Sequence, residues 1–308
     1  MRDAGHSAKL GLCLAAVYFI WGSSFLFTKI AVNHLPAALF SGIRFVTAGS
    51  ILALVAAYWR GDAWPAIAEW RHCLITGFFM VFVSNGLSVW AMHTIPTNES
   101  ALLNSTAAFW IAGLGVFGKR GHPLTRRALT GLGIGFLGTV LVLIPRESLS
   151  AADLQARGAV LLGCLGWSLG TLYYRSIDTS LSSVMFTALQ MLCGGSMLLT
   201  VALARHDWVR WAPDAQGITA LCYLTLCSSC IAYTAYGWLT LNTRPAVIGT
   251  YSYVNPAIAA FLGWQFLHEQ LSRIQLVGMA VIIAGVVLLT LPGGRYSDPK
   301  TLEEPQAQ

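Results

Sequence analysis

Long runs of apolar residues occupy most of this chain and restrict its fold more than any other feature. The first run extends from Leu10 to Lys29, and a transmembrane helix needs about 20 mostly apolar residues. In hydrocarbon every backbone N–H and C=O group needs a partner within the protein, so only helices and closed barrels span it. The runs here are of helical length and lack the alternation of barrel strands. The chain is therefore predicted to be an all-α polytopic membrane protein.

Composition supports this class and excludes others. Hydrophobic residues make up 56% of the chain and charged residues only 10%, which is incompatible with a water-soluble domain that has a polar shell. The net charge of +6 is interpreted as the result of basic residues that orient the loops and contact anionic lipid. Nucleic acid is therefore not an expected partner. The first run is too long for a cleaved signal peptide and is interpreted as a retained helix.

Breaks at charge, proline and turn clusters divide the apolar runs into ten predicted transmembrane helices. They cover 11–30, 35–59, 72–92, 98–118 and 125–144 in the first half, and 158–176, 181–204, 217–240, 246–267 and 271–291 in the second. The predicted units are residues 1–10 before the first helix, 11–145 as the first repeat, 146–157 as a connecting loop and 158–292 as the second repeat. Residues 293–308 are polar and broken by proline, which predicts a disordered tail.

The two halves repeat each other in sequence. A shift of 146 residues places Trp21 on Trp167 and Lys29 on Arg175, and a shift of 147 places Gly138 on Gly285. Each repeat holds five predicted helices, an odd number, so the second repeat must enter the membrane from the opposite side. The sequence therefore predicts two inverted five-helix repeats.

Loop charges test this inversion independently, because Lys and Arg accumulate on cytoplasmic loops. The loop 119–127 carries Lys119, Arg120, Arg126 and Arg127, whereas its counterpart at 268–273 keeps only Arg273. With the N-terminus inside, the basic residues concentrate on the cytoplasmic side. Both termini are therefore expected to be cytoplasmic.

Inverted repeats are typical of secondary transporters, because two similar halves can exchange conformations around a midplane site and alternate its exposure. Three segments then carry a family resemblance, and they are Trp21-Gly22-Ser23-Ser24-Phe25 with Lys29, Arg44-Phe45, and Tyr251-Ser252-Tyr253-Val254-Asn255-Pro256 leading to Gly263 and His268-Glu269-Gln270-Leu271. In this order, and over nearly the whole chain, they resemble the EamA family of the drug/metabolite transporter superfamily.

The resemblance implies ten helices around a central cavity in a cell membrane, most simply a bacterial inner membrane. It also implies export or exchange of amino acids or related small metabolites. Two positions depart from the family pattern. Pro256 has Phe109 at the matching place in the first repeat, and the acidic residue of His268-Glu269 is missing from Gly121-His122-Pro123. We interpret the His268-Glu269 motif as structural.

Arg44 is the strongest candidate for a substrate contact. It lies about nine residues, or roughly 13 Å, into the second predicted helix, where its side chain cannot easily reach the membrane surface. Its guanidinium can bind a substrate carboxylate in bidentate fashion, or it can pair with carbonyls or a polar neighbour and fix helix packing. Lys29 lies at a helix end, where snorkelling to the interface accounts for it.

Other polar and aromatic residues are candidates for lining the cavity. They are Trp21, Ser24, Asn85, Trp90, Trp167, Tyr173, Gln190, Tyr233, Tyr236 and Asn255. Glu99 begins the fourth helix and is interpreted either as a helix cap or as a proton-coupling carboxylate, with His93 nearby in sequence. A proton is therefore a possible coupling ion.

No cofactor or metal site is predicted. The pair Cys227 and Cys230 stands alone in an apolar helix, so packing is the expected role of these cysteines. No convergent nucleophile, base or metal set lies in the helices, so an enzyme is not expected.

Gly131 and Gly135 form G-x-x-x-G, which favours close helix packing within the chain over a dimer contact.

Three functions remain open at this stage. They are a proton-coupled transporter, a passive facilitator, and a membrane scaffold or sensor without transport. The sequence leaves a monomer and a homodimer equally possible.

Overall fold

The computed structural model describes residues 2–115, 126–143, 150–243, 251–270 and 272–290. Within these residues the chain is helical and contains no strand. In the described part of the chain, five helices are long and apolar enough to cross a membrane, and they are Ser7–His34, Ala37–Trp59, Ile67–Ala91, Ser183–Ala204 and Ala215–Asn242. Shorter apolar helices cover Leu129–Gly138, Val254–Leu267 and Leu276–Gly285. The all-α polytopic class is confirmed, whereas the count of ten spans stays a prediction.

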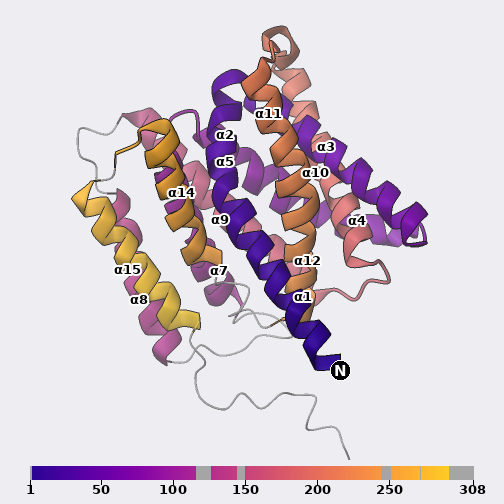
Figure 1. Ribbon diagram of the computed structural model, residues 1–308, viewed down its shortest axis with the longest axis horizontal. Helices are drawn as coiled ribbons and strands as arrows, with labels where there is room; N and C mark the ends of the chain where they lie inside the picture. Colours follow the sequence, from indigo (N-terminus) through magenta and orange to yellow (C-terminus); the bar gives the residue numbers. More distant parts are fainter. Residues whose placement is uncertain (1, 116–125, 144–149, 244–250, 271, 291–308) are drawn as a thin grey trace, which may run out of the picture.

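The first half consists of helices (Figure 1), three of which continue through short π-helical stretches among the described residues. Its elements are α1 (Arg2–Ala16), η1 (Val17–Trp21), α2 (Gly22–His34), α3 (Ala37–Leu54), η2 (Val55–Trp59), α4 (Ile67–Thr76), η3 (Gly77–Asn85), α5 (Gly86–Ala91), α6 (Thr97–Asn104), α7 (Ala107–Leu114) and α8 (Arg126–Leu143). The second half follows the same plan. Its elements are α9 (Ala151–Ser176), α10 (Ser183–Ala204), η4 (Asp207–Arg210), α11 (Ala215–Tyr223), η5 (Leu224–Ala232), α12 (Tyr233–Asn242), α14 (Tyr251–Leu267) and α15 (Arg273–Thr290).

Two helix starts differ from the sequence prediction. The helix α1 begins at Arg2, within the segment expected to precede the first span. The helix α9 begins at Ala151, within the expected connecting loop, because Ser150 and Asp153 form a capping box. In this box Ser150 Oγ accepts from Asp153 N at 3.1 Å, and the Asp153 carboxylate accepts from Ser150 N at 3.1 Å. The predicted tail 293–308 and the basic residues Lys119 and Arg120 lie outside the described residues.

The fourth predicted helix is divided into α6 and α7 at Ser105 and Thr106. Both hydroxyls donate to a carbonyl three residues earlier, Ser105 Oγ to Leu102 O at 2.6 Å and Thr106 Oγ1 to Leu103 O at 2.7 Å. Such bonds compete with the regular helical ladder and bend the chain. Its repeat counterpart α14 instead continues through Pro256. The first half therefore interrupts this helix, whereas its described counterpart in the second half is continuous.

Corresponding helices of the two halves pack against each other in antiparallel orientation. A Cβ atom built on Gly49 of α3 would lie 2.8 Å from Ala188 O of α10, and one built on Gly42 would meet Leu199. Residue numbers rise along one helix while they fall along the other. Two equivalent helices that run antiparallel are what an inverted repeat requires.

The helices α8 and α15 form the second pair of this kind, at the left of Figure 1. A Cβ atom on Gly138 would lie 2.7 Å from Ile282 N, and one on Gly285 would lie 2.5 Å from Gly135 N and 2.8 Å from Gly131 O. The G-x-x-x-G residues therefore serve helix packing within the chain, as expected.

The remaining helices enclose the centre of the molecule. The segment α1–η1–α2 lies against α11–η5, and α9 lies against η3 and α5. The nine-residue π-helical stretches η3 and η5 coincide under the 147-residue shift, and π-helical turns are frequent at functional sites. These two stretches and η1 bring polar side chains to a central cavity.

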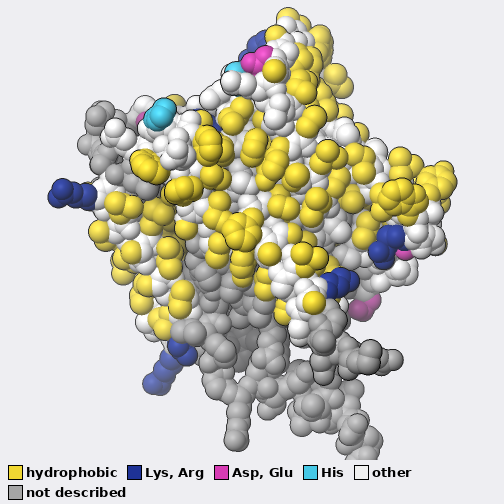
Figure 2. Space-filling view, viewed as in Figure 1, with side chains coloured by type: hydrophobic (Ala, Val, Ile, Leu, Met, Phe, Trp, Pro, Cys, Tyr) yellow, Lys and Arg dark blue, Asp and Glu magenta, His cyan; other side chains and the backbone are white. Residues whose placement is uncertain are grey.

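The outer surface is rich in exposed apolar side chains. Figure 2 shows hydrophobic side chains across the visible face, with charged groups mostly at its margins. Exposed apolar residues include Leu12, Phe19, Ile67, Phe136 and Trp264. A water-soluble monomer rarely exposes so continuous an apolar surface, so this face fits contact with lipid.

Candidate functional site

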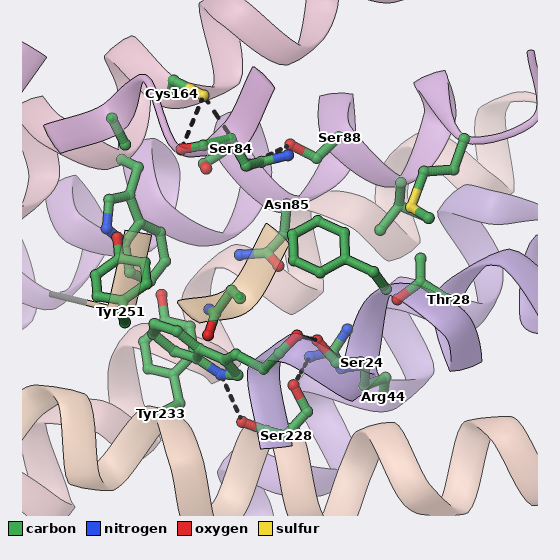
Figure 3. A pocket seen from close by; sticks show the side chains of 18 residues that line it. Ser24, Thr28, Arg44, Ser84, Asn85, Ser88, Cys164, Ser228, Tyr233 and Tyr251 are labelled. Atoms are coloured by element: carbon green, nitrogen blue, oxygen red, sulfur yellow. Dashed lines mark hydrogen bonds between the residues drawn. The ribbon is translucent and has the colours of Figure 1, made fainter. Parts of the chain in front are cut away.

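A cavity of about 120 Å³ lies between the two halves (Figure 3). It extends along the first long helix from Trp21 to Thr28, which corresponds to roughly 10 Å of helix. The lining residues are Trp21, Ser24, Phe25, Thr28, Arg44, Ser84, Asn85, Ser88, Val89, Met92, Asn104, Ala107, Cys164, Trp167, Ser228, Tyr233, Tyr251 and Asn255. Both repeats contribute to this wall, as expected for a site at the repeat interface.

Arg44 reaches this cavity from α3 and is only 4% exposed. Its Nε donates to Ser229 Oγ at 2.8 Å and its Nη2 donates to Ser228 Oγ at 3.0 Å, both on η5. A guanidinium has five N–H donors, so the two serines leave the Nη1 group and one N–H of Nη2 available. The serines therefore hold the guanidinium by one edge, and the other edge can bind a second, bidentate partner.

The described lining contains no acidic side chain that could neutralise Arg44. Its guanidinium lies over the ring of Phe45, with the Cζ atom 4.6 Å from the ring centroid. A buried charge without an ionic partner is expensive, and such charges within membrane helices mark substrate or ion pathways. The contacts with Ser228 and Ser229 agree with the interpretation that Arg44 pairs with polar neighbours and fixes helix packing. The substrate contact of Arg44 stays a prediction.

Aromatic rings form one wall of the cavity. The Trp21 ring centroid lies 5.5 Å from that of Trp167, 5.1 Å from that of Tyr236 and 5.5 Å from that of Tyr251. Trp167 Nε1 donates to Tyr236 Oη at 3.1 Å, which satisfies two polar groups in an otherwise apolar cluster. Trp21 and Trp167 occupy equivalent positions of the two repeats, so each repeat contributes the same tryptophan to this wall.

The structure brings most of the predicted site residues together. The predicted residues that line the cavity are Arg44, Trp21, Ser24, Asn85, Trp167, Tyr233 and Asn255. Gln190 and Tyr236 lie behind this lining, where Gln190 Nε2 donates to Tyr233 Oη at 2.9 Å. Trp90 and Tyr173 are outside it, because Trp90 is 39% exposed and Tyr173 Oη is hydrogen-bonded to His72 Nδ1 at 2.7 Å.

Glu99 is buried but does not line the cavity. Its Oε1 accepts from Arg157 Nε at 2.5 Å. The capping role considered for Glu99 belongs instead to Glu269, which accepts from Thr97 N at 2.7 Å and from Asn98 N at 3.2 Å. The carboxylate of the His268-Glu269 motif therefore caps α6 from the other repeat, which confirms the structural interpretation of that motif. His93 is exposed and also lies outside the lining.

Lys29 and Arg175 have equivalent structural roles in the two repeats. Lys29 Nζ donates to Met92 O at 2.6 Å and to Ile95 O at 3.1 Å, beyond the end of α5. Arg175 Nη1 donates to Thr240 O at 2.7 Å near the end of α12. Cations stabilise the negative C-terminal ends of helices. Lys29 therefore binds carbonyls at and beyond the end of α5, and its snorkelling to the interface stays a prediction.

Several cavity residues were missing from the sequence prediction, chiefly small polar residues of η3, α5, α6 and η5. Ser84, Ser88, Asn104 and Ser228 line the cavity, yet serine and asparagine occur at many helical positions here. One signal that could have found Ser228 is its position beside Ser229 in an otherwise apolar stretch. Among the described residues, no three His, Cys, Asp or Glu side chains gather as metal ligands.

Comparison with known proteins agrees with this architecture. The profile of the EamA-like transporter family matches residues 9–144 and 157–291. A solved structure described only as "Crystal structure of protein" shares the fold, with a TM-score of 0.68 at 17% identity, over 92% of this chain and 97% of its own.

Curated relatives span the same length. The "Uncharacterized inner membrane transporter YedA" of Escherichia coli (strain K12) is 32% identical over 93% of this chain and 91% of its own. An "Uncharacterized transporter" of Archaeoglobus fulgidus is 27% identical over 92% and 98%, and "Protein PecM" of Dickeya dadantii is 26% identical over 88% of each chain. With the family profile matching both halves, this chain belongs to the EamA-like transporter family, a family of polytopic membrane transporters for small molecules.

Proposed function

We propose that this protein is a secondary transporter that exports a small carboxylate-bearing metabolite, an amino acid or a related organic compound, by alternating access. The observation that carries the proposal is Arg44, a buried guanidinium with a free edge in a cavity whose described lining has no acid. A carboxylate is the planar partner that such an edge binds in bidentate fashion.

The cavity size supports a small solute. Its volume of about 120 Å³ is below the range of about 300–1,000 Å³ that is typical of drug-sized ligands. Alternating access is supported by the antiparallel pairs α3 with α10 and α8 with α15, because two equivalent halves can exchange conformations around this cavity. The excess of basic residues on one set of loops supports an orientation with both termini in the cytoplasm.

Counterflow in proteoliposomes tests transport directly. Vesicles that contain the purified full chain are loaded with an unlabelled mixture of small carboxylates, and uptake of labelled solutes from the outside is measured one at a time. We expect at least one labelled carboxylate to accumulate above the level in protein-free vesicles. The absence of exchange for every solute, although a ligand stabilises the same protein preparation, would instead favour a scaffold or sensor.

We further propose that Glu99 carries a coupling proton. It is 4% exposed and paired with Arg157, so protonation would break a buried ion pair and release α6 from α9. In the Glu99→Gln variant we expect gradient-driven accumulation to fall at least tenfold while downhill exchange persists. The matched comparison is His93→Gln, for which we expect accumulation to remain. Equal accumulation by wild type and Glu99→Gln would identify a passive facilitator or a different coupling site.

A further inference from the structure

The polar groups of the cavity carry charge of one sign only. Arg44 is the one charged side chain in the described lining. The other polar lining residues are serines, a threonine, asparagines, a cysteine and aromatic groups, which are neutral near pH 7 in their ordinary state. A bound solute therefore meets one cation and a set of neutral dipoles.

Two carboxylates near the start of α6, the buried Glu99 and the half-buried Glu269, have partners of their own. Glu99 accepts from Arg157 Nε at 2.5 Å, and Glu269 accepts from the backbone amides of Thr97 and Asn98. Neither carboxylate is part of the described lining. An ammonium group on the solute would have no counter-ion in the described lining and would lie in the field of Arg44. A cation beside another cation in a poorly solvated site is disfavoured.

Asn255 indicates what the solute offers at a second point. Its side chain lines the cavity and is 5% exposed, and its Oδ1 atom has no hydrogen-bond donor among the described residues. A buried acceptor without a donor costs free energy, so a ligand that supplies a donor is favoured. A hydroxyl group supplies that donor without adding positive charge.

We infer that the solute is a small hydroxy acid, an organic anion with a neutral hydroxyl near its carboxylate. The site then discriminates against the zwitterionic amino acid of the same shape. This inference rests on the proposed function, since it takes the free edge of Arg44 to bind the carboxylate of the solute.

Matched pairs of ligands test the charge of this second group. Glycerate and serine share a carbon skeleton, a carboxylate and a terminal hydroxyl, and they differ in the hydroxyl or ammonium on the central carbon; lactate and alanine form a second pair. Thermal stabilisation of the purified full chain is measured against the concentration of each. We expect the hydroxy acid to reach half-maximal stabilisation at a concentration at least tenfold lower than its amino acid. Equal or tighter binding of the amino acids, or no stabilisation by either hydroxy acid, would overturn the inference.

A negative charge introduced into the cavity provides the sharper readout. Asn255→Asp keeps the shape of the side chain and adds the carboxylate that the lining lacks. We expect the ratio of serine to glycerate affinity to rise at least tenfold, a change that a purely structural role of Asn255 would not produce. The control is Asn242→Asp at the exposed end of α12, which should leave the ratio unchanged. Monodisperse elution of both variants confirms folding, and an unchanged ratio in folded Asn255→Asp contradicts the inference.

Flux of the same pairs separates this inference from the proposed function. Exchange of serine but not of glycerate in proteoliposomes would leave transport standing and overturn the hydroxy-acid assignment. Stabilisation by glycerate with no exchange of any solute would leave the ligand class standing and overturn transport.

Discussion

Replacing Arg44 by Gln is expected to weaken solute binding about 100-fold and to reduce exchange in proteoliposomes to background. The variant removes the single charge of the described lining and the two-point contact that a guanidinium makes with a carboxylate. A loss of this size corresponds to about 3 kcal/mol, within the usual cost of removing one partner of a buried, hydrogen-bonded charge pair. Thermal stabilisation against glycerate and counterflow give the two readouts.

Two further variants separate binding from packing at this position. Arg44→Lys keeps the charge but loses the planar fork, so we expect partial binding with a weaker preference for carboxylates. Arg175 lies on α9 and donates to a carbonyl outside the cavity. Arg175→Gln should therefore lower the thermal stability of the protein without changing its affinity for the solute. Normal affinity in a folded Arg44→Gln protein would contradict a substrate role for Arg44.

Replacing Gly138 by Val is expected to destabilise the protein by about 3 kcal/mol, at the upper end for overpacking. The new Cβ atom would lie 2.7 Å from Ile282 N and 3.0 Å from Gly278 O, so backbone atoms of α15 must shift. Side chains can rotate away from such a contact, whereas a packed helix backbone cannot. Fluorescence-detected elution and thermal unfolding in detergent measure the loss.

Gly133→Val is the matched control on the same helix. A Cβ atom on Gly133 meets nothing within 4 Å, while the change in helix propensity is the same for both substitutions. We therefore expect Gly133→Val to elute and unfold nearly as the wild type does. Equal stability of the two variants would show that α8 and α15 do not pack as closely as described.

Hydrophobicity and repetition were sufficient to predict the fold class. Apolar runs without charge leave a helix as the stable choice in lipid, so the polytopic all-α class followed from composition and length. Trp21 and Trp167 revealed the repeat, and the antiparallel packing of α3 with α10 agrees with the inversion inferred from it. Helix ends were less accurate, because the capping box of Ser150 and Asp153 extends α9 into a segment that looked polar enough for a loop.

The site was only partly predictable. Arg44 was identifiable because a charge deep in a membrane helix is costly and needs a reason. Its serine partners lie more than 180 positions away in sequence, and no local pattern connects them. Trp90 and Tyr173 were expected in the cavity and lie outside it. The π-helical stretch η3 precedes Trp90 and changes which face of that helix turns inward, whereas Tyr173 lies on the regular helix α9 and bonds His72.

The sequence by itself determined that this protein folds in lipid, as two related helical halves of opposite orientation with one deeply placed cation. These properties depend on the cost of placing backbone groups and charged side chains in lipid, and that cost can be judged from the residue types of each segment. Only the tertiary structure decided which polar side chains meet, that Glu269 rather than Glu99 caps α6, and that Arg44 lines a cavity whose described lining has no acid. Those outcomes depend on how helices distant in sequence rotate and cross. The contacts that fix this arrangement join residues far apart in the sequence, so no local pattern reveals them.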